Sequence, residues 1–378
     1  MKIVEPSYEI LIHPDQEEHD DVLKYIEKIG RTCYKSEDKI TAESAPKFIN
    51  MLRDRGHWAM LEHFRFVLRA NYTMFDLLEV LETTERFDFP SLRTFTRFIE
   101  YTINNPEYPE DENGNEAEQV TVFSFSITTI NNVLREISNR IDEFTDTTEL
   151  AAIYYIAYFM NVNYPELIVI DELTQKIFNS FTEYDYSVIS SIGFACFIDD
   201  DSFPKHEWQT VKFTCSRGFS HECVRHRPAS YAQSSTRYCN YSKGQFGSEL
   251  NIIDIRKTLD TLPEEADKEE IYQVWKASCE DIEEAYMAMI NLGAAPQIAR
   301  SVLPNSLMTE VNMTATLEEW HHFFKMRADK PAHPEMKQLA VPLLKEFITL
   351  FPGVFDDLEY RLEENKEYLP EVKNEQSV

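Results

Sequence analysis

At 378 residues the chain is longer than a usual single domain, so we expect either two domains or one large core with an insertion. Its formal net charge of −29 disfavours bulk binding to nucleic acid and to anionic membranes, although a local basic pocket could still capture one small anionic ligand. The 43% hydrophobic and 13% aromatic content excludes a largely disordered chain.

Cysteine usage and the lack of long apolar runs predict a cytoplasmic protein. None of the six cysteines forms a C-x-x-C pair, and their irregular spacing does not suggest a disulfide framework. Residues 1–6 include an acidic residue and a proline where a signal peptide needs an apolar stretch. The longest mostly apolar run, 150–162, is too short to span a bilayer. We therefore expect neither secretion nor membrane insertion, and no nucleic-acid partner.

The pattern of the first seventy residues predicts two helices, near 21–33 and 44–55, followed by a strand over 63–70. In that strand apolar side chains alternate with mostly polar ones, as in a strand with one buried face. The side chains expected to face the core are those of Phe64, Phe66 and Leu68.

Residues 71–206 have a different texture, and we interpret them as a mainly helical insertion between two strands of the main fold. An acidic segment over 106–118, with Pro, Asn and Gly, predicts a loop. The helices are expected near 73–82, 128–143, 146–161 and 171–182.

The remaining elements predict a strand over 209–215, a short helix within 218–227, and longer helices over 268–291, over 317–327 and from Pro334 onward. Helix 268–291 carries an apolar stripe at three- and four-residue steps, formed by Ile271, Val274, Trp275, Ile282, Ala285, Tyr286 and Met289. Gly293 is expected to end it. The charged tail, 361–378, is expected to fray.

Together these elements predict an α+β fold, in which helices pack on a small sheet that contains antiparallel strands. We expect a discontinuous core formed by 1–70 and 207–360, with 71–206 as the insertion.

The most informative segment runs from 225 to 238. Arg225, His226, Arg227 and Arg237 stand here among serines and threonines, in a chain that is strongly acidic. Guanidinium groups combined with hydroxyl donors suit phosphate oxygens, so the segment predicts a site for a phosphorylated ligand. The alternative, that the arginines only neutralise neighbouring carboxylates, stays open on composition alone.

Several motifs resemble those of flavin-dependent thymidylate synthases, in the same order along the chain. The run Arg225-His226-Arg227, seven residues, then Ser235-Thr236-Arg237 is similar to the signature motif of that family. The supporting segments are Gly56 to His63 (GHWAMLEH), Ala299 to Pro304 (ARSVLP), Met326 to Asp329 (MRAD) and Arg31 to Tyr34 (RTCY). The resemblance leaves 71–206 unmatched. Departures from the family pattern occur at Ala59, Glu222 and Thr316.

The resemblance implies methylation of dUMP to dTMP with 5,10-methylenetetrahydrofolate, FAD, and NADPH or NADH as reductant. It also implies a homotetramer with shared active sites. The residues that match the FAD and folate side are His57, Arg225, His226, Arg227, Gln233 and His322. Those that match the dUMP side are Glu222, Cys223, Val224, Arg225, Gln233, Ser234, Ser235, Thr236, Arg237, Arg300 and Arg327.

Arg327 is the expected catalytic residue, because it matches the family position that contacts the uracil. A fixed cation there would stabilise the negative charge that develops as the pyrimidine C5 attacks the methylene carbon. Reduced flavin would then deliver hydride, so no protein nucleophile is needed.

Other kinds of site are weaker interpretations. The histidines, including His57, His63 and His226, have no standard zinc spacing, and no metal site is expected. Ser235 lacks the G-x-S-x-G turn of a hydrolase nucleophile. No G-x-G-x-x-G or P-loop sequence occurs. The alternative function is a non-catalytic nucleotide- or RNA-binding module that uses the Arg-His-Arg segment.

Overall fold

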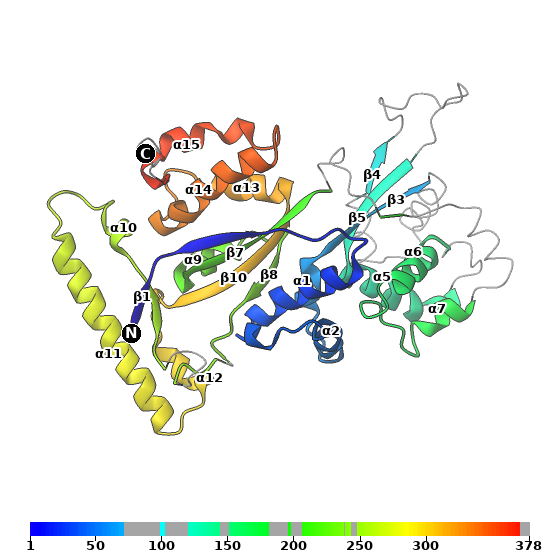
Figure 1. Ribbon diagram of the computed structural model, residues 1–378, viewed down its shortest axis with the longest axis horizontal. Coiled ribbons are helices and arrows are strands. Elements are labelled where there is room, and N and C mark those ends of the chain that lie inside the picture. Colours follow the sequence, from blue (N-terminus) through cyan, green and yellow to red (C-terminus); the bar gives the residue numbers. More distant parts are fainter. Residues whose placement is uncertain are drawn as a thin grey trace. The chain divides into compact units, whose positions relative to one another are not determined.

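The computed structural model describes residues 1–71, 99–102, 120–143, 151–180, 196–197, 206–237, 239–242 and 248–370 (Figure 1). The chain divides into two compact units, which are described separately. Unit 1 comprises Met1–Ile12, Gly30–Glu37 and Trp208–Val378, and unit 2 comprises His13–Ile29 and Asp38–Glu207.

Unit 1 is built on a four-stranded antiparallel sheet in the order β2-β7-β10-β8. Its strands are β2 (Ser7–Leu11), β7 (Trp208–Ser216), β10 (Met308–Thr316) and β8 (Ser230–Gln233). The central pair, β7 and β10, is in register over nine residues, from Met308 opposite Ser216 to Thr316 opposite Trp208. Most side chains of this pair are buried, so the two strands form a rigid base for the segments that leave their ends.

Helices cover the sheet of unit 1 around an aromatic core. α9 (Arg217–Cys223) follows β7, α13 (Leu317–Arg327) follows β10, and α14 (Pro334–Leu350) packs beside α13 (Figure 1). The fully buried aromatic rings of this core are Phe213, Trp320, Phe323, Phe324, Phe347 and Phe355. Their ring contacts fix α13, because adjacent aromatic pairs such as Phe324 and Phe347 lie at 5.1 Å between centroids.

The chain ends in three short elements, η7 (Asp356–Leu358), α15 (Tyr360–Glu364) and η8 (Lys366–Tyr368). The expectation of a frayed tail is therefore wrong for residues 361–370, because short helical elements form here and Tyr368 and Leu369 pack against the core. Residues 371–378 lie outside the described part of the chain.

A second part of unit 1 surrounds β1 (Lys2–Val4), which pairs in parallel with β9 (Asn251–Ile253). The helices here are α10 (Arg256–Leu259), α11 (Lys268–Asn291), α12 (Pro296–Ala299) and the 3₁₀ turn η6 (Arg300–Val302). Gly293, with a φ of +97°, follows the end of α11 as expected.

The predicted inward stripe of α11 is partly wrong. Ile271 and Val274 are exposed, by 39% and 58%, whereas Tyr272, Cys279 and Tyr286 are the buried residues. These three are spaced seven residues apart, so the helix buries a narrow seam and leaves part of its apolar surface uncovered.

Unit 2 contains a second four-stranded sheet, in the order β4-β5-β3-β6. Its strands are β4 (Ile99–Thr102), β5 (Val120–Ser126), β3 (Arg65–Asn71) and β6 (Cys196–Phe197). Phe64, Phe66 and Leu68 are buried, which confirms the alternation predicted for this strand.

The helices that accompany this sheet include α2 (Ala45–Asp54), α5 (Ile127–Asn139), α6 (Ala151–Asn163) and α7 (Gln175–Ser180), with short 3₁₀ turns η1 (Glu37–Lys39), η2 (Trp58–His63) and η3 (Ile141–Glu143). Helix α1 (His19–Thr32) begins in unit 2, and its last residues belong to unit 1.

The predicted α+β fold is confirmed, with helices packed on small antiparallel sheets. The helix expected near 73–82 and the acidic loop 106–118 lie outside the described residues. In the part of the chain that the structure covers, no helix combines the length and apolarity needed to cross a membrane.

Candidate functional site

The C-terminal ends of α9 and α13 meet, and four predicted site residues gather there. We call Glu222, His226, His322 and Arg327 the histidine cluster. Ser216 caps the start of α9. Its Oγ accepts from the backbone N–H of Phe219 across 3.0 Å and donates to the buried Glu335 across 2.6 Å. These contacts fix the start of α9, and its end then presents Glu222 to Arg327.

Arg327, the last residue of α13, holds the end of α9 with three different nitrogens. Its Nη1 donates to Glu222 Oε2 at 2.6 Å, and its Nη2 donates to the Glu222 carbonyl at 2.9 Å. Its Nε donates to His226 Nε2 at 3.0 Å. A guanidinium carries five N–H groups, so two remain for another acceptor. The side chain is 16% exposed.

His226 is a buried neutral base with one ring nitrogen unused. Only 6% of the residue is exposed, and its Nδ1 has no hydrogen-bond partner among the described residues. Because Nε2 accepts from Arg327, the proton of the neutral ring must be on Nδ1. Burial lowers the pKa of His226 to about 4, with further contributions from the charges of Arg327 and His322. The ring therefore offers one buried N–H donor at neutral pH.

Aromatic contacts and one hydroxyl hold the loop around His226. The His226 ring lies 5.5 Å from the ring of His322 and 5.1 Å from that of Phe323, both on α13. The Tyr231 hydroxyl is within donating distance of two loop carbonyls, at 2.7 Å from that of His226 and 2.9 Å from that of Cys223. The loop conformation is thus set before any ligand arrives.

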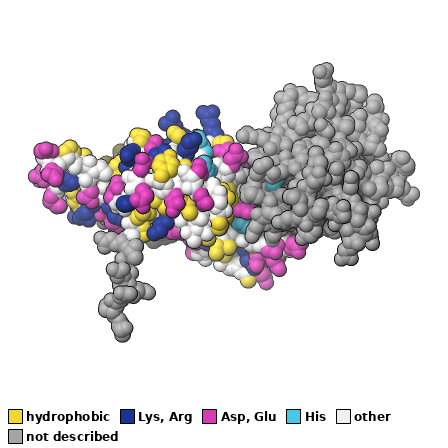
Figure 2. Space-filling model, turned by 90° about the horizontal axis from the view of Figure 1, so that it is seen from above, with side chains coloured by type: hydrophobic (Ala, Val, Ile, Leu, Met, Phe, Trp, Pro, Cys, Tyr) yellow, Lys and Arg dark blue, Asp and Glu magenta, His cyan; other side chains and the backbone are white. Residues whose placement is uncertain are grey.

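Arg225 and Arg227 flank His226 and are exposed. The Arg225 N–H donates to the Glu222 carbonyl at 3.3 Å, but neither arginine side chain forms a hydrogen bond or ion pair with a residue that the structure describes. Elsewhere on unit 1, Lys and Arg side chains lie among Asp and Glu side chains, as Figure 2 shows for the face it presents. Neutralisation of nearby carboxylates, the alternative interpretation of the basic segment, therefore does not describe these two arginines.

A second group of residues, of which Thr236 and Arg300 were predicted, gathers near the end of β8. We call Arg217, Thr236, Arg300 and Thr309 the arginine cluster. Arg300 Nη1 donates to Thr236 Oγ1 at 3.4 Å, and Arg217 Nη1 donates to Thr309 Oγ1 at 3.5 Å, both long hydrogen bonds. Burial, together with the nearby charge of Arg300, lowers the pKa of Arg217.

Two guanidinium groups close together repel each other unless an anion lies between them. No carboxylate pairs with Arg217 or Arg300 among the described residues. The arrangement therefore suits a phosphate. Arg217 was missed in the sequence, although its place directly after a buried strand, five residues before Glu222, was a usable signal.

The segment that links the two clusters is anchored to β10. Ser234 Oγ accepts from the Glu310 N–H at 3.0 Å and lies 3.0 Å from Thr309 Oγ1, and Gln233 Nε2 donates to Thr309 Oγ1 at 3.2 Å. The Ser235 N–H donates to the Cys33 carbonyl at 3.2 Å. These bonds leave the Ser234 side chain committed to the sheet.

Residue Ser235 differs from Ser234, because its Oγ accepts only from the Arg237 N–H, at 3.2 Å, among the described residues. Its hydroxyl hydrogen thus has no acceptor in the described part of the chain. Ser235 can therefore donate a hydrogen bond to a ligand held by the arginine cluster.

Three predicted residues do not present side chains to either cluster. Cys223 is fully buried, its Sγ contacts Met313 Sδ at 3.7 Å, and burial raises the pKa of its thiol to about 12. Val224 is 41% exposed next to it. His57 precedes η2 in unit 2, after Gly56 with its φ of +69°, and its role stays a prediction of the resemblance.

Within the chain the two clusters are separated by strand β8. Four residues of antiparallel strand correspond to about 10 Å. The residues of β8 pair with Val311 to Thr314 of β10. No three His, Cys, Asp or Glu side chains of the described residues converge as a metal site.

Comparison with known proteins identifies relatives over this region. The family described as Thymidylate synthase complementing protein matches residues 198–353, which contain both clusters. A flavin-dependent thymidylate synthase of Mycolicibacterium vanbaalenii is 33% identical over 170 residues, covering 43% of this chain and 67% of the relative. One of Geobacter sulfurreducens is 31% identical over 189 residues, covering 50% of this chain and 74% of the relative.

A solved structure, that of a UMP/dUMP methylase PolB from Streptomyces cacaoi bound with 5-Br dUMP, matches with a TM-score of 0.35 and 19% identity, over 43% of this chain and 75% of that one. That likeness is too low to bear on fold or activity. The two sequence relatives are more than 30% identical to this chain over at least two thirds of their own length. The chain is therefore an enzyme of the flavin-dependent thymidylate synthase family.

Proposed function

We propose that the protein methylates dUMP to dTMP, with 5,10-methylenetetrahydrofolate as carbon donor and FAD, reduced by NADPH or NADH, as hydride source. The observation that carries this proposal is the histidine cluster. In a family of flavin-dependent enzymes, the buried neutral His226 has an Nδ1–H without a partner among the described residues, and the side chains of Arg225 and Arg227 beside it are unpaired within the same part of the chain.

The residues of the loop 224–229 fit FAD. Arg225 and Arg227 offer unpaired guanidinium groups to a pyrophosphate, which such groups bind in a two-pronged manner. His226 offers a single buried N–H to an acceptor atom of a ring system. When bound, FAD would supply the hydride of the final step. The protein's contribution is to hold the loop in place and to exclude water.

Arg327 is proposed to act on the pyrimidine of dUMP. Two of its N–H groups are unused, and its charge cannot be lost by deprotonation at any ordinary pH. A cation near the pyrimidine oxygens would stabilise the negative charge that develops when C5 attacks the methylene carbon. Glu222 holds the guanidinium in one position, so it needs little rearrangement during the reaction.

The arginine cluster is proposed to bind the nucleotide phosphate. Arg217 and Arg300 lack carboxylate partners among the described residues, and Ser235 has a hydroxyl hydrogen to donate. Thr236 and Arg237 lie in the turn that directly follows Ser235. This assignment leaves the catalytic step to groups outside the cluster, because no hydroxyl or thiol here is activated as a nucleophile. Burial in fact raises the pKa of the nearby Cys239 thiol to about 11.

We further propose a cytoplasmic homotetramer with shared active sites. Two features of unit 1 support association between copies. Ile271 and Val274 on α11, with Leu292 and Ile298 beyond it, expose apolar surface. The two clusters are also separated by the length of β8, so a second copy could complete each site.

Both clusters lie outside 71–206, which supports a peripheral role for that insertion.

The function is tested by assaying dTMP formation from dUMP while omitting the folate, FAD and the nicotinamide in turn. Omitting the folate should abolish turnover at once, and omitting the nicotinamide should stop it when any reduced flavin already bound has been oxidised. Omitting FAD should abolish turnover in protein from which the flavin has first been removed. A purified protein that shows flavin absorption bands would agree with the proposal. A colourless protein that cannot be reconstituted with FAD but still binds nucleotide, with strong salt dependence, would favour the alternative of a non-catalytic nucleotide- or RNA-binding module.

A further inference from the structure

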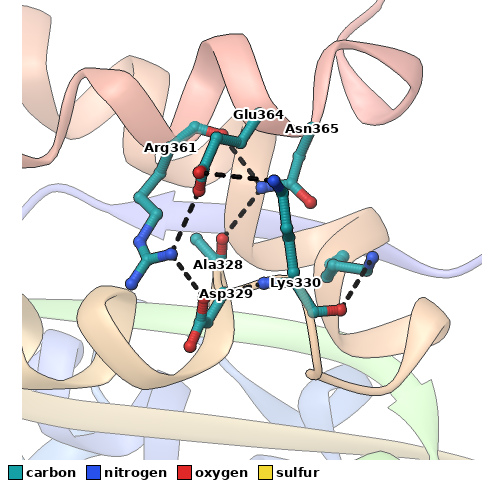
Figure 3. A network of polar contacts seen from close by, with 7 residues as sticks. Ala328, Asp329, Lys330, Arg361, Glu364 and Asn365 are labelled. Atoms are coloured by element: carbon teal, nitrogen blue, oxygen red, sulfur yellow. Dashed lines mark hydrogen bonds and ion pairs between the residues drawn. The ribbon is translucent and has the colours of Figure 1, made fainter.

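The end of α13 is held by a residue from the far end of the chain (Figure 3). Asn365 donates from Nδ2 to the Ala328 carbonyl across 3.0 Å, and to the Arg361 carbonyl across 3.0 Å. Both residues at this contact are buried, with Asn365 1% and Ala328 0% exposed. The last carbonyls of a helix have no partner within the helix. Asn365 supplies one for the residue that directly follows Arg327.

A half-buried group of ion pairs supports the same junction. Arg361, in α15, donates from Nη1 to Asp329 and, across 3.1 Å, to Glu364. Lys330 Nζ lies 3.5 Å from the other oxygen of Glu364. Figure 3 shows these side chains on one side of the turn that follows α13. Arg361 is only 13% exposed, so water screens these charges less than at an open surface.

The position of this network makes Arg327 depend on it. Arg327 is the last residue of α13, and terminal helical turns fray unless something holds them. All three hydrogen bonds of its guanidinium reach across to α9 and the loop after it. Without an anchor on its own side, the backbone of residues 327–329 could shift and carry the guanidinium away from Glu222 and His226.

The anchoring residues lie outside the region that matches the family. The match ends at residue 353, so Arg327 to Lys330 lie inside it, whereas Arg361 and Asn365 lie beyond it. The matched region therefore contains Arg327 and Asp329, but not the side chains of Arg361 and Asn365, which hold this turn.

We propose that Arg361 and Asn365 are positioning residues, which fix the C-terminal turn of α13 and thereby hold Arg327 against Glu222 and His226. Their expected effect on turnover rests on the proposed role of Arg327 at the pyrimidine. Their expected effect on the geometry of the histidine cluster is independent of that role.

The experiment compares Asn365→Ala, Arg361→Ala and Arg327→Ala with a matched control. Lys366→Ala removes a cation from the same segment, but this lysine pairs only with the exposed Glu363 among the described residues. Two properties are measured in the FAD-loaded proteins, namely kcat and KM for dUMP. A third is the imidazole pKa of His226, followed by NMR, with its resonance identified by its loss in His226→Gln.

The NMR measurement reports on position and not on general stability. Arg327 and His322 are the charged or titratable groups whose fields act on His226, both from α13, and removing the nearby cation should raise the imidazole pKa. We expect a rise in Asn365→Ala, Arg361→Ala and Arg327→Ala, and no change in Lys366→Ala. We also expect kcat to fall between about tenfold and 10²-fold in the first two, since small misplacements of a catalytic group have effects of this size.

Arg361→Lys, which keeps the charge, should recover part of the loss. Folded Asn365→Ala and Arg361→Ala proteins with the parent's kcat and the parent's His226 pKa would overturn the proposal. If Asn365→Ala does not fold, Arg361→Ala decides alone. A normal turnover in Arg327→Ala would instead overturn the proposed function of that arginine, while a raised His226 pKa in Asn365→Ala would still support the positioning role.

Discussion

Arg327 and His226, which are 101 residues apart in sequence, are joined by a hydrogen bond from the guanidinium Nε to the imidazole Nε2 across 3.0 Å. An arginine cannot accept, so the imidazole must, and its proton is confined to Nδ1. A permanent cation thereby determines the tautomer of the histidine and favours its neutral form. The two residues act as one unit, in which one side chain carries the charge and the other a buried neutral donor.

The neutral state of His226 predicts a pH dependence of stability. Its pKa is about 4 in the folded protein and near 6.5 when unfolded, so the unfolded chain binds more protons between these values. The free energy of unfolding should therefore decrease as the pH is lowered from 6.5 to 4, by at most about 3 kcal/mol from this group. Denaturant titrations across this range would measure it.

His226→Gln should flatten that part of the pH dependence. His221→Gln is the control, because this histidine on α9 is exposed and its side chain forms no hydrogen bond or ion pair with the described residues. If both variants follow the pH dependence of the parent protein, His226 is not the neutral buried base described above.

Much of the fold was predictable because its signals are local. Helices 268–291 and 317–327 were predicted with the bounds that α11 and α13 have, since apolar periodicity and end signals lie within each segment. The exposure of Ile271 was not predictable, because it depends on which side of α11 the distant β9 region covers. Apolar periodicity predicts which side of a helix is apolar, but not which other element packs against that side.

The candidate site was predictable only as a set of residues. The motifs named Glu222, His226, His322 and Arg327, and the structure places these side chains together. The sequence did not predict that Arg327 bonds to a glutamate 105 residues away, nor that Asn365 donates to the carbonyl of Ala328, because both are tertiary contacts. Arg217 was overlooked because its significance depends on its proximity to Arg300.

Arg225 and Arg227 should be needed for flavin binding. Both side chains are exposed and neither forms a hydrogen bond or ion pair with a described residue, so replacing either by Ala should leave the thermal unfolding temperature nearly unchanged. Loss of its contact to a pyrophosphate should reduce FAD retention on purification. Lys345→Ala, which removes another exposed cation from unit 1, serves as control. Unchanged flavin content in both arginine variants would contradict the FAD assignment of this loop.

Arg217→Gln should weaken binding of dUMP. A hydrogen bond to a charged group contributes about 1.5–3 kcal/mol, which corresponds to roughly a ten- to hundredfold increase in Kd. Deoxyuridine, which lacks the phosphate, is the matched ligand for this test, and its affinity should not change. Equal losses for dUMP and deoxyuridine would mean that Arg217 supports the fold of the site instead of the phosphate.

Either Ser235 or Arg327 could be taken for the catalytic residue, and their variants should behave differently. Ser235 has a hydroxyl hydrogen to donate, so Ser235→Ala should lose about 0.5–3 kcal/mol of dUMP binding and keep measurable turnover. Arg327→Ala should lose about 10²–10³-fold in kcat, the range for removing one donor to a developing negative charge.

Arg327→Lys separates charge from geometry in the same residue. An ammonium keeps the positive charge but cannot bond at once to Glu222 and His226 in the pattern of the planar guanidinium, so only part of the activity should return. The comparison is made as kcat at saturating dUMP, with FAD occupancy measured in every variant. An inactive Ser235→Ala together with a nearly normal Arg327→Ala would identify the serine as a nucleophile, and the mechanism proposed for this site would be wrong.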